Sequence, residues 1–178
     1  MKRTITLLAL ALSLSMAVGC NDNKNTDGST TEKNADPESA KADIYAIADK
    51  FHAAFKNKKI DELKMLIDDN GFFMGTDPGE VYSHQSFVDY LNKKLSNPAI
   101  GTINYKIDRR EMIFEDNGEG VILVDQFTPD VFTQHIPWRM ATHLVKKDNV
   151  WKFDFISFSL TPNNDVVPAI NMAAYQGE

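Results

Sequence analysis

Disulfides, metal motifs and phosphate loops are missing from this chain. Its 178 residues include one cysteine, Cys20, so the fold cannot depend on an internal disulfide. The four histidines show neither HxH nor HExxH spacing, and no glycine-rich phosphate loop is present, so we expect no metal and no cofactor. Basic residues are also outnumbered, with 19 Lys and Arg against 25 Asp and Glu and a net charge of −6. That balance argues against nucleic acid as a partner.

The longest apolar run stands at the N-terminus. Lys2 and Arg3 precede it, and it ends in small residues before Cys20, as in a secretory signal peptide. The run is too short for a stable spanning helix. Its tail, Ala-Val-Gly-Cys at 17–20, resembles a bacterial lipobox, although alanine stands where leucine is most common. The alternative interpretation is an ordinary secretory signal with an incidental cysteine.

We therefore predict a lipoprotein signal peptide over 1–19 and lipidation of Cys20 by acyl chains such as palmitate. Two or more chains give stable anchoring, so the membrane is a predicted partner. Residues 20–39 contain no large apolar side chain after the cysteine and are predicted to be a flexible tether, spanning roughly 24 Å root-mean-square. Asn21 stands where an aspartate is associated with inner-membrane retention. Its presence favours the outer membrane of the cell envelope, on either the periplasmic side or the surface.

Three helices and a run of strands are predicted over 40–162. A helical apolar stripe begins near Pro37 and ends near Lys56, and a second helix over 60–68 ends at Asn70-Gly71. Short strands at 72–76 and 80–82 flank a turn, and Ser83 begins a third helix. Longer strands follow over 102–115 and 120–127. The tail over 163–178 is predicted to be loose or bound to the surface.

The stretch 135–160 reads as one long hairpin around Asp148-Asn149. Simple alternation then pairs Leu144 with Phe153 and puts one more apolar face toward the core. The register predicts the opposing pairs Thr142/Phe155, Met140/Ser157 and Trp138/Ser159 on that face. The other face carries His143 opposite Asp154, which we interpret as a surface pair worth about 0.2–1 kcal/mol.

The order of these elements resembles the NTF2-like superfamily, in its SnoaL-like or DUF4440-like branch. The stretch MGTDPGEVY at 74–82 carries the resemblance, together with Phe87, Leu91 and the residues Thr142, Leu144, Val145, Lys146, Trp151, Phe153, Phe158 and Ser159 of the hairpin. It implies an α+β cone in which three N-terminal helices pack on a curved, mostly antiparallel sheet around a cavity. It also implies a homodimer through the outer sheet face. Ser157 stands where relatives often have histidine, which removes one acid/base group.

A ligand pocket is expected under the core face of the hairpin. The residues predicted to line it are Phe55, Phe73, Tyr82, Asp125, Trp138, Met140, Phe155, Ser157 and Ser159. The two serines are the most informative, because buried hydroxyls need partners that a cavity or water would supply. The aromatic side chains on this face can equally be ordinary residues of the hydrophobic core.

Asp125 and Tyr82 are the catalytic candidates. Asp125 is in phase with Val121, Leu123 and Phe127, so an inward Asp125 would have its pKa raised by burial and could act as general acid or base, with Tyr82 as an oxyanion donor. The opposite set on 120–127 is nearly as apolar, which leaves the direction of Asp125 open.

Two functions follow from these predictions. The preferred one is a membrane-anchored domain that binds a small, largely apolar ligand or a protein partner without catalysis. The alternative is an isomerase-like or cyclase-like enzyme that uses Asp125 and Tyr82 on a carbonyl compound.

Overall fold

The computed structural model describes residues 37–175. The predicted signal peptide and Cys20, the predicted lipidation site, lie outside the described residues. Within the described part, no helix combines the length and the apolar character needed to cross a membrane.

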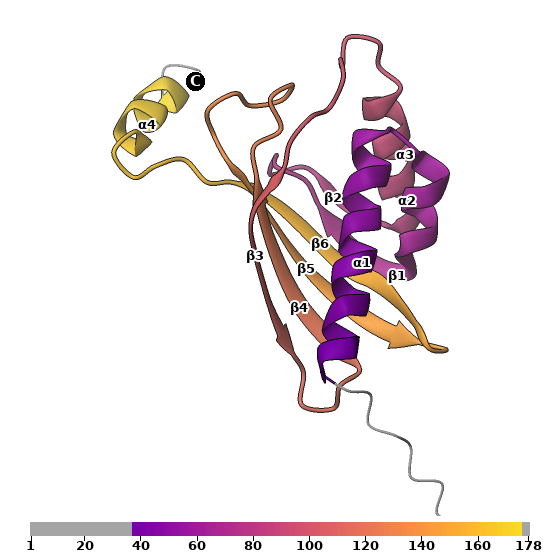
Figure 1. The fold of residues 1–178 in the computed structure, drawn as a ribbon. Helices are drawn as coiled ribbons and strands as arrows, with labels where there is room; N and C mark the ends of the chain where they lie inside the picture. Colours follow the sequence, from indigo (N-terminus) through magenta and orange to yellow (C-terminus); the bar gives the residue numbers. More distant parts are fainter. Residues whose placement is uncertain (1–36, 176–178) are drawn as a thin grey trace, which may run out of the picture. The chain divides into compact units, whose positions relative to one another are not determined.

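Three helices cover one face of a sheet (Figure 1). Helix α1 spans Pro37–Lys56, α2 spans Ile60–Leu66 and α3 spans His84–Leu95. The apolar stripe of α1 is buried, because residues three or four apart share one side of a helix. Ser83 is the N-cap residue of α3, although its hydroxyl contacts the Ser86 hydroxyl at 3.1 Å instead of capping a backbone N–H.

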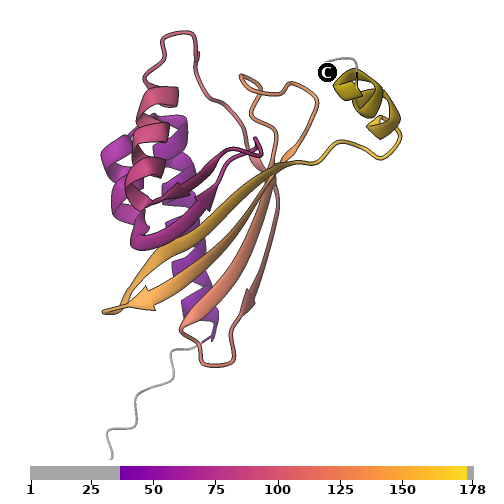
Figure 2. The ribbon, with the colours of Figure 1, turned by 180° about the vertical axis from the view of Figure 1, so that it is seen from behind.

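Six strands form one mixed sheet in the order β2-β1-β6-β5-β4-β3. The strands are β1 (Ile67–Met74), β2 (Val81–Ser83), β3 (Ile107–Phe114), β4 (Gly120–Phe127), β5 (Trp138–Lys147) and β6 (Val150–Leu160). Neighbouring strands are antiparallel except β1 and β6, which pair in parallel. Seen from behind, the opposite face of the sheet is not covered by α1–α3 (Figure 2). The predicted α+β cone with three N-terminal helices is therefore confirmed.

The boundary between the second helix and the first strand differs from the prediction. Helix α2 ends at Leu66, and β1 begins directly at Ile67, so Asn70-Gly71 lies inside the strand. Asp68 accounts for part of this difference in the helix boundary. Its side chain accepts the Asn70 backbone N–H at 2.9 Å and pairs with Lys147 Nζ at 2.8 Å. Ile67 and Phe72 both pair with β6, and Asn70-Gly71 falls in the irregularity between them, so the chain continues as a strand on both sides of this pair.

The open question about β4 is settled by burial. Val121, Leu123, Asp125 and Phe127 are each no more than 1% exposed, whereas Ile122 is 49% exposed. The first set therefore faces the helices. Asp125 points inward with it.

The hairpin register is correct near the turn and wrong beyond it. Lys147 pairs with Val150 and Leu144 with Phe153, as predicted, but a bulge inserts Asp154 before the next pair. Beyond the bulge every β6 side chain changes face, because side chains alternate along a strand. The observed pairs are Thr142/Ile156, Met140/Phe158 and Trp138/Leu160.

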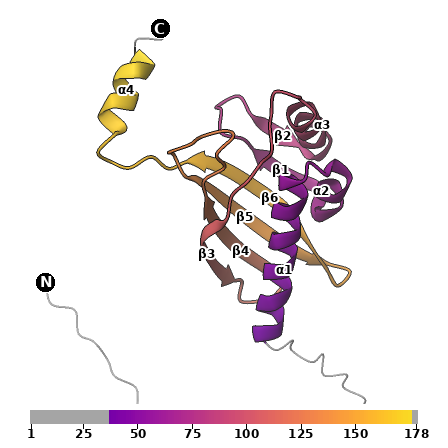
Figure 3. The same ribbon diagram turned by 45° about the horizontal axis from the view of Figure 1, so that its top comes forward.

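The C-terminal tail over 163–178 contains a helix that was not predicted, because the prolines and asparagines of this segment suggested a loop. Helix α4 spans Val167–Tyr175 and follows a linker after β6 (Figure 3). None of its residues is buried. Pro168 stands in its first turn, where a missing backbone N–H costs nothing.

Candidate functional site

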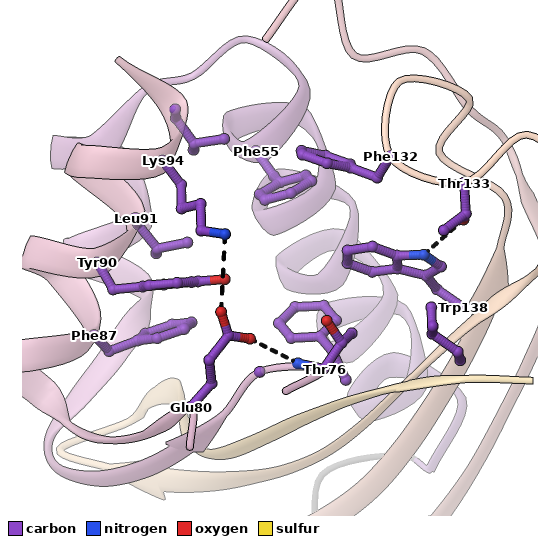
Figure 4. Close-up of a pocket in the computed structure, with 14 residues that line it drawn as sticks. Phe55, Thr76, Glu80, Phe87, Tyr90, Leu91, Lys94, Phe132, Thr133 and Trp138 are labelled. Carbon is purple, nitrogen blue, oxygen red and sulfur yellow. Dashed lines mark hydrogen bonds and ion pairs between the residues drawn. The ribbon is translucent and has the colours of Figure 1, made fainter. Parts of the chain in front are cut away.

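A cavity of about 250 Å³ opens beside α3 and the ends of β5 and β6 (Figure 4). It is lined by Phe55, Gly75, Thr76, Glu80, Phe87, Tyr90, Leu91, Lys94, Leu95, Phe132, Thr133, Trp138, Phe158 and Leu160. Its size suits a small organic molecule.

Helix α3 supplies one wall by its periodicity. Phe87, Tyr90, Leu91, Lys94 and Leu95 follow the i, i+3, i+4, i+7, i+8 spacing that places side chains on one face. The turn before β2 supplies the floor, and the segment before β5 closes the far side.

The far wall is a group of aromatic rings. Phe132 lies 6.3 Å from Phe55 and 5.4 Å from Trp138, measured between ring centroids, and Trp138 meets Phe158 edge-on at 5.9 Å. These distances are in the range of favourable aromatic pairs. The Trp138 indole N–H donates to Thr133 Oγ1 at 2.8 Å, and that hydroxyl donates to the Ile136 carbonyl at 2.8 Å. The donors at this end are therefore satisfied internally.

The opposite end of the cavity is polar. Glu80 Oε2 accepts the backbone N–H groups of Thr76 and Asp77 at 2.9 and 3.2 Å. Its carboxylate also accepts the Tyr90 hydroxyl, and Oε1 lies 3.9 Å from Lys94 Nζ. Figure 4 shows these three side chains pointing toward one another. Burial, together with the hydrogen bond to Glu80, raises the pKa of Tyr90 far above its ordinary range, so this phenol stays a hydrogen-bond donor.

Two of the predicted pocket residues, Phe55 and Trp138, line the cavity. Phe73 and Met140 are fully buried in the core instead, and Tyr82 stacks on Tyr90 with 4.7 Å between ring centroids.

The bulge removes three further predicted residues from the pocket side. Phe155, Ser157 and Ser159 lie on the outer sheet face, and Phe158 and Leu160 line the cavity in their place. The prediction that the hydroxyls of Ser157 and Ser159 are buried and face the cavity is therefore wrong.

Asp125 lies in a buried ionic network outside the cavity lining. Arg110 of β3 binds it through two N–H groups, with Nε to Oδ1 at 2.7 Å and Nη2 to Oδ2 at 2.9 Å. His52 of α1 reaches Asp125 Oδ2 through Nε2 at 2.9 Å, and its Nδ1 lies 2.9 Å from the Tyr105 hydroxyl. A tautomer with the proton on Nε2 satisfies every contact, because Tyr105 then donates to Nδ1. Arg110 also donates to Asp49 Oδ1 at 2.8 Å.

The pKa of Asp125 moves opposite to the prediction. Burial alone would raise it, but the hydrogen bonds from His52 and Arg110 and the guanidinium charge outweigh burial and hold the pKa below its ordinary value. Asp125 therefore stays ionised at neutral pH, and the expected elevated carboxyl pKa is wrong. Burial and the charge of Asp125 raise the pKa of Tyr105 far above its ordinary range.

The two catalytic candidates are not brought together. Tyr82 belongs to β2 and Asp125 to β4, and β1, β6 and β5 lie between those strands in the sheet. Asp125 is instead bound by His52 and Arg110. A general-base and oxyanion-donor pair made of these two residues does not form.

His143 and Asp154 meet as the sequence suggested, with Nδ1 and Oδ1 2.7 Å apart. Both side chains are about a quarter exposed, and His143 Nε2 also contacts Glu115 at 3.0 Å. This is a partly exposed cluster on the outer face of the sheet. Across residues 37–175, no group of three or more His, Cys, Asp or Glu is arranged to hold a metal ion.

Sequence reasoning missed the polar end and the buried network. The helical spacing places Tyr90 on the inward side of α3 with Phe87, and Lys94 could have been found from the same spacing, since all three share one face of the helix. His52 carried a weaker signal, because it stands beside Phe51 at the edge of the apolar stripe. Its partner Asp125 is 73 residues away, so no local pattern joins them.

The fold and chain match known proteins as follows. A family model described as a SnoaL-like domain matches residues 44–163. An NTF2-like protein of unknown function from Pseudomonas putida has a TM-score of 0.61 at 8% identity, covering 72% of this chain and 92% of that one. A hexachlorocyclohexane dehydrochlorinase from Novosphingobium barchaimii scores 0.59 at 12% identity, covering 70% and 88%.

A putative calcium/calmodulin dependent protein kinase II association domain from Xanthomonas campestris scores 0.54 at 19% identity, covering 67% and 86% of the two chains. No match was found among curated proteins. These structural likenesses concern the fold alone. The family model covers most of the chain, and the chain therefore belongs to the SnoaL-like family.

Proposed function

We propose that this domain binds a small, largely apolar ligand in the α3 cavity and does not transform it. The observation that carries the proposal is the composition of the lining, in which six aromatic and three leucine side chains enclose the space and the polar groups gather at one end. Binding sites for small molecules combine such apolar walls with a few placed polar groups.

The cavity offers little acid/base chemistry. Glu80 Oε2 is bound by two backbone N–H groups, and the Tyr90 phenol has a strongly raised pKa. The buried pair of His52 and Asp125, which would be the natural proton carrier, is not among the lining residues. Efficient general catalysis needs a group within hydrogen-bond reach of the reacting atom and a pKa near the working pH.

The test is a binding titration with neopentylbenzene, a neutral apolar probe, followed by tryptophan fluorescence, to which Trp138 in the cavity wall contributes. We expect saturable binding in the wild type and at least fivefold weaker binding in Phe132→Ala, which opens the aromatic wall. Phe72→Ala is the matched control, because Phe72 is 48% exposed and stacks on Phe155 at 6.3 Å on the outer face. Equal affinities in both variants, or no binding of any small probe, would contradict the proposal.

The buried pair of His52 and Asp125 favours a second candidate, a SnoaL-like enzyme that acts on a carbonyl compound. Such an enzyme would exchange the proton next to the carbonyl group with solvent deuterium, and Asp125→Asn would abolish that exchange. The non-catalytic proposal predicts no exchange above the uncatalysed rate in either protein. It also predicts that Asp125→Asn, if folded, still binds the neutral probe.

We further propose that the chain is a lipoprotein of the cell envelope, anchored through Cys20. Support comes from the lipobox-like residues and the single cysteine at the expected boundary. Cys20→Ser should release the protein from the membrane fraction. Unchanged membrane association of this variant would refute the anchor, and fractionation of inner and outer membranes tests the outer-membrane assignment.

A further inference from the structure

The polar end of the cavity already holds a positive charge. Lys94 comes from the last turn of α3, and its ammonium lies 3.9 Å from Glu80 Oε1 and 5.5 Å from the ring centroid of Tyr90. A carboxylate together with an aromatic face is the environment in which proteins hold organic cations. Lys94 therefore marks a cation-binding position within the cavity.

The carboxylate at this position is fixed, whereas the lysine is not. Glu80 is 16% exposed and held through Oε2 by the backbone N–H groups of Thr76 and Asp77. Lys94 is 54% exposed, and at 3.9 Å its contact with Oε1 is too long for a hydrogen bond. Because an exposed ion pair of this kind contributes little, the lysine can leave at low cost.

The surrounding charges favour a cation over an anion. Asp77 stands beside Glu80, and the negative charges of both residues, after burial and the hydrogen bond, contribute to the raised pKa of Tyr90. With Lys94 withdrawn, the Glu80 carboxylate is the one charged group among the lining residues. The net charge of the whole chain, −6, also draws cations toward the protein.

We propose that the cavity binds an organic monocation, an aryl- or alkylammonium whose positive head takes the place of the Lys94 ammonium between Glu80 and Tyr90. Its apolar body lies against the aromatic wall of Phe55, Phe132 and Trp138. The inference rests on the proposed ligand-binding function and names the chemical class of the ligand.

The experiment compares three probes of similar shape in the full mature chain at low ionic strength. Benzyltrimethylammonium carries the charge, neopentylbenzene is its carbon isostere, and 3-phenylpropionate is the anionic counterpart. We expect the cation to bind about two- to thirtyfold more tightly than the isostere, the range that cation–aromatic contacts give from exposed to desolvated sites. The anion should bind most weakly.

Two variants locate the effect. Glu80→Gln keeps an oxygen for the backbone N–H groups but removes the charge, so the preference for the cation should fall toward onefold with little change for the isostere. Lys94→Met removes the competing ammonium and should tighten binding of the cation selectively. Glu62→Gln is the control, because Glu62 pairs with Lys59 at 2.7 Å on the exposed surface of α2. The ratio of cation affinity to isostere affinity in this variant should equal that of the wild type.

The outcomes separate this inference from the proposed function. If the isostere binds as well as the cation, or if the anion binds most tightly, the cation site is refuted while ligand binding stands. An unchanged ratio in Glu80→Gln would also refute it. If none of the three probes binds, the proposed function itself fails.

Discussion

Replacing Asp125 by asparagine tests the buried ionic network most directly. The carboxylate is fully buried and accepts two N–H groups of Arg110 and one of His52. Asparagine has nearly the same shape but offers one acceptor oxygen and an NH₂ group. That NH₂ must face a donor of Arg110 or His52, so at least one buried hydrogen bond becomes a clash between donors.

The expected cost follows from the surroundings of the arginine. Removing one partner of a buried ion pair costs about 3–5 kcal/mol, because the other charge stays buried and unpaired. Arg110 keeps its contact with Asp49 at 2.8 Å and is 12% exposed, so the cost should lie at the low end of this range. We expect a loss of about 3 kcal/mol, which for a domain of this size lowers Tm by on the order of 10 °C.

Urea denaturation followed by tryptophan fluorescence measures this loss. Asp154→Asn is the matched control, since Asp154 makes a single 2.7 Å contact with His143 at about a quarter exposure and should cost at most about 1 kcal/mol. If Asp125→Asn loses no more stability than Asp154→Asn at an unchanged denaturant slope, the network does not stabilise the fold as argued.

Two further predictions concern the pH response and the bulge. Since the folded pKa of Asp125 is depressed, its stabilising contribution should be complete above about pH 4, the ordinary carboxyl pKa, and should be lost as pH falls toward the folded value. Acid titration of unfolding free energy should show a shallower slope in Asp125→Asn, and an equal slope would contradict this sign. Deletion of Asp154 should cost no more than about 1 kcal/mol, because it removes the extra residue of the bulge and its partly exposed contact with His143, while Ile156 and Phe158 keep the faces that they have now. A loss of more than about 3 kcal/mol by the same denaturation assay would mean that the deletion shifts the register and would refute the bulge at Asp154.

The sequence by itself determined the local elements and the family resemblance. Helix α1 and strand β4 follow from spacing that repeats every 3.6 or two residues, which depends only on backbone geometry. The turn of the last hairpin follows from the polar pair Asp148-Asn149. The family resemblance predicted three helices on a curved sheet. The family model that matches residues 44–163 supports this prediction.

Tertiary structure decided the direction of β4. Its two faces are nearly equal in apolar character, so the sequence pattern does not distinguish them. In the structure, the inward face is the one on which Asp125 contacts His52 of α1 and Arg110 of β3. The pKa of Asp125 depended on the same contacts. Burial alone would have raised it, and partners distant in sequence lowered it.

The bulge at Asp154 was equally inaccessible to pattern reasoning. Apolar residues occupy both phases of β6 around it, from Phe153 and Phe155 to Ile156 and Phe158, so either register satisfies local alternation. Packing on β1 and β5 selected the register that buries Ile156 and leaves Ser157 on the outer face. Residue spacing fixes which side chains share a face, but only the packing of distant strands and helices fixes which face is buried.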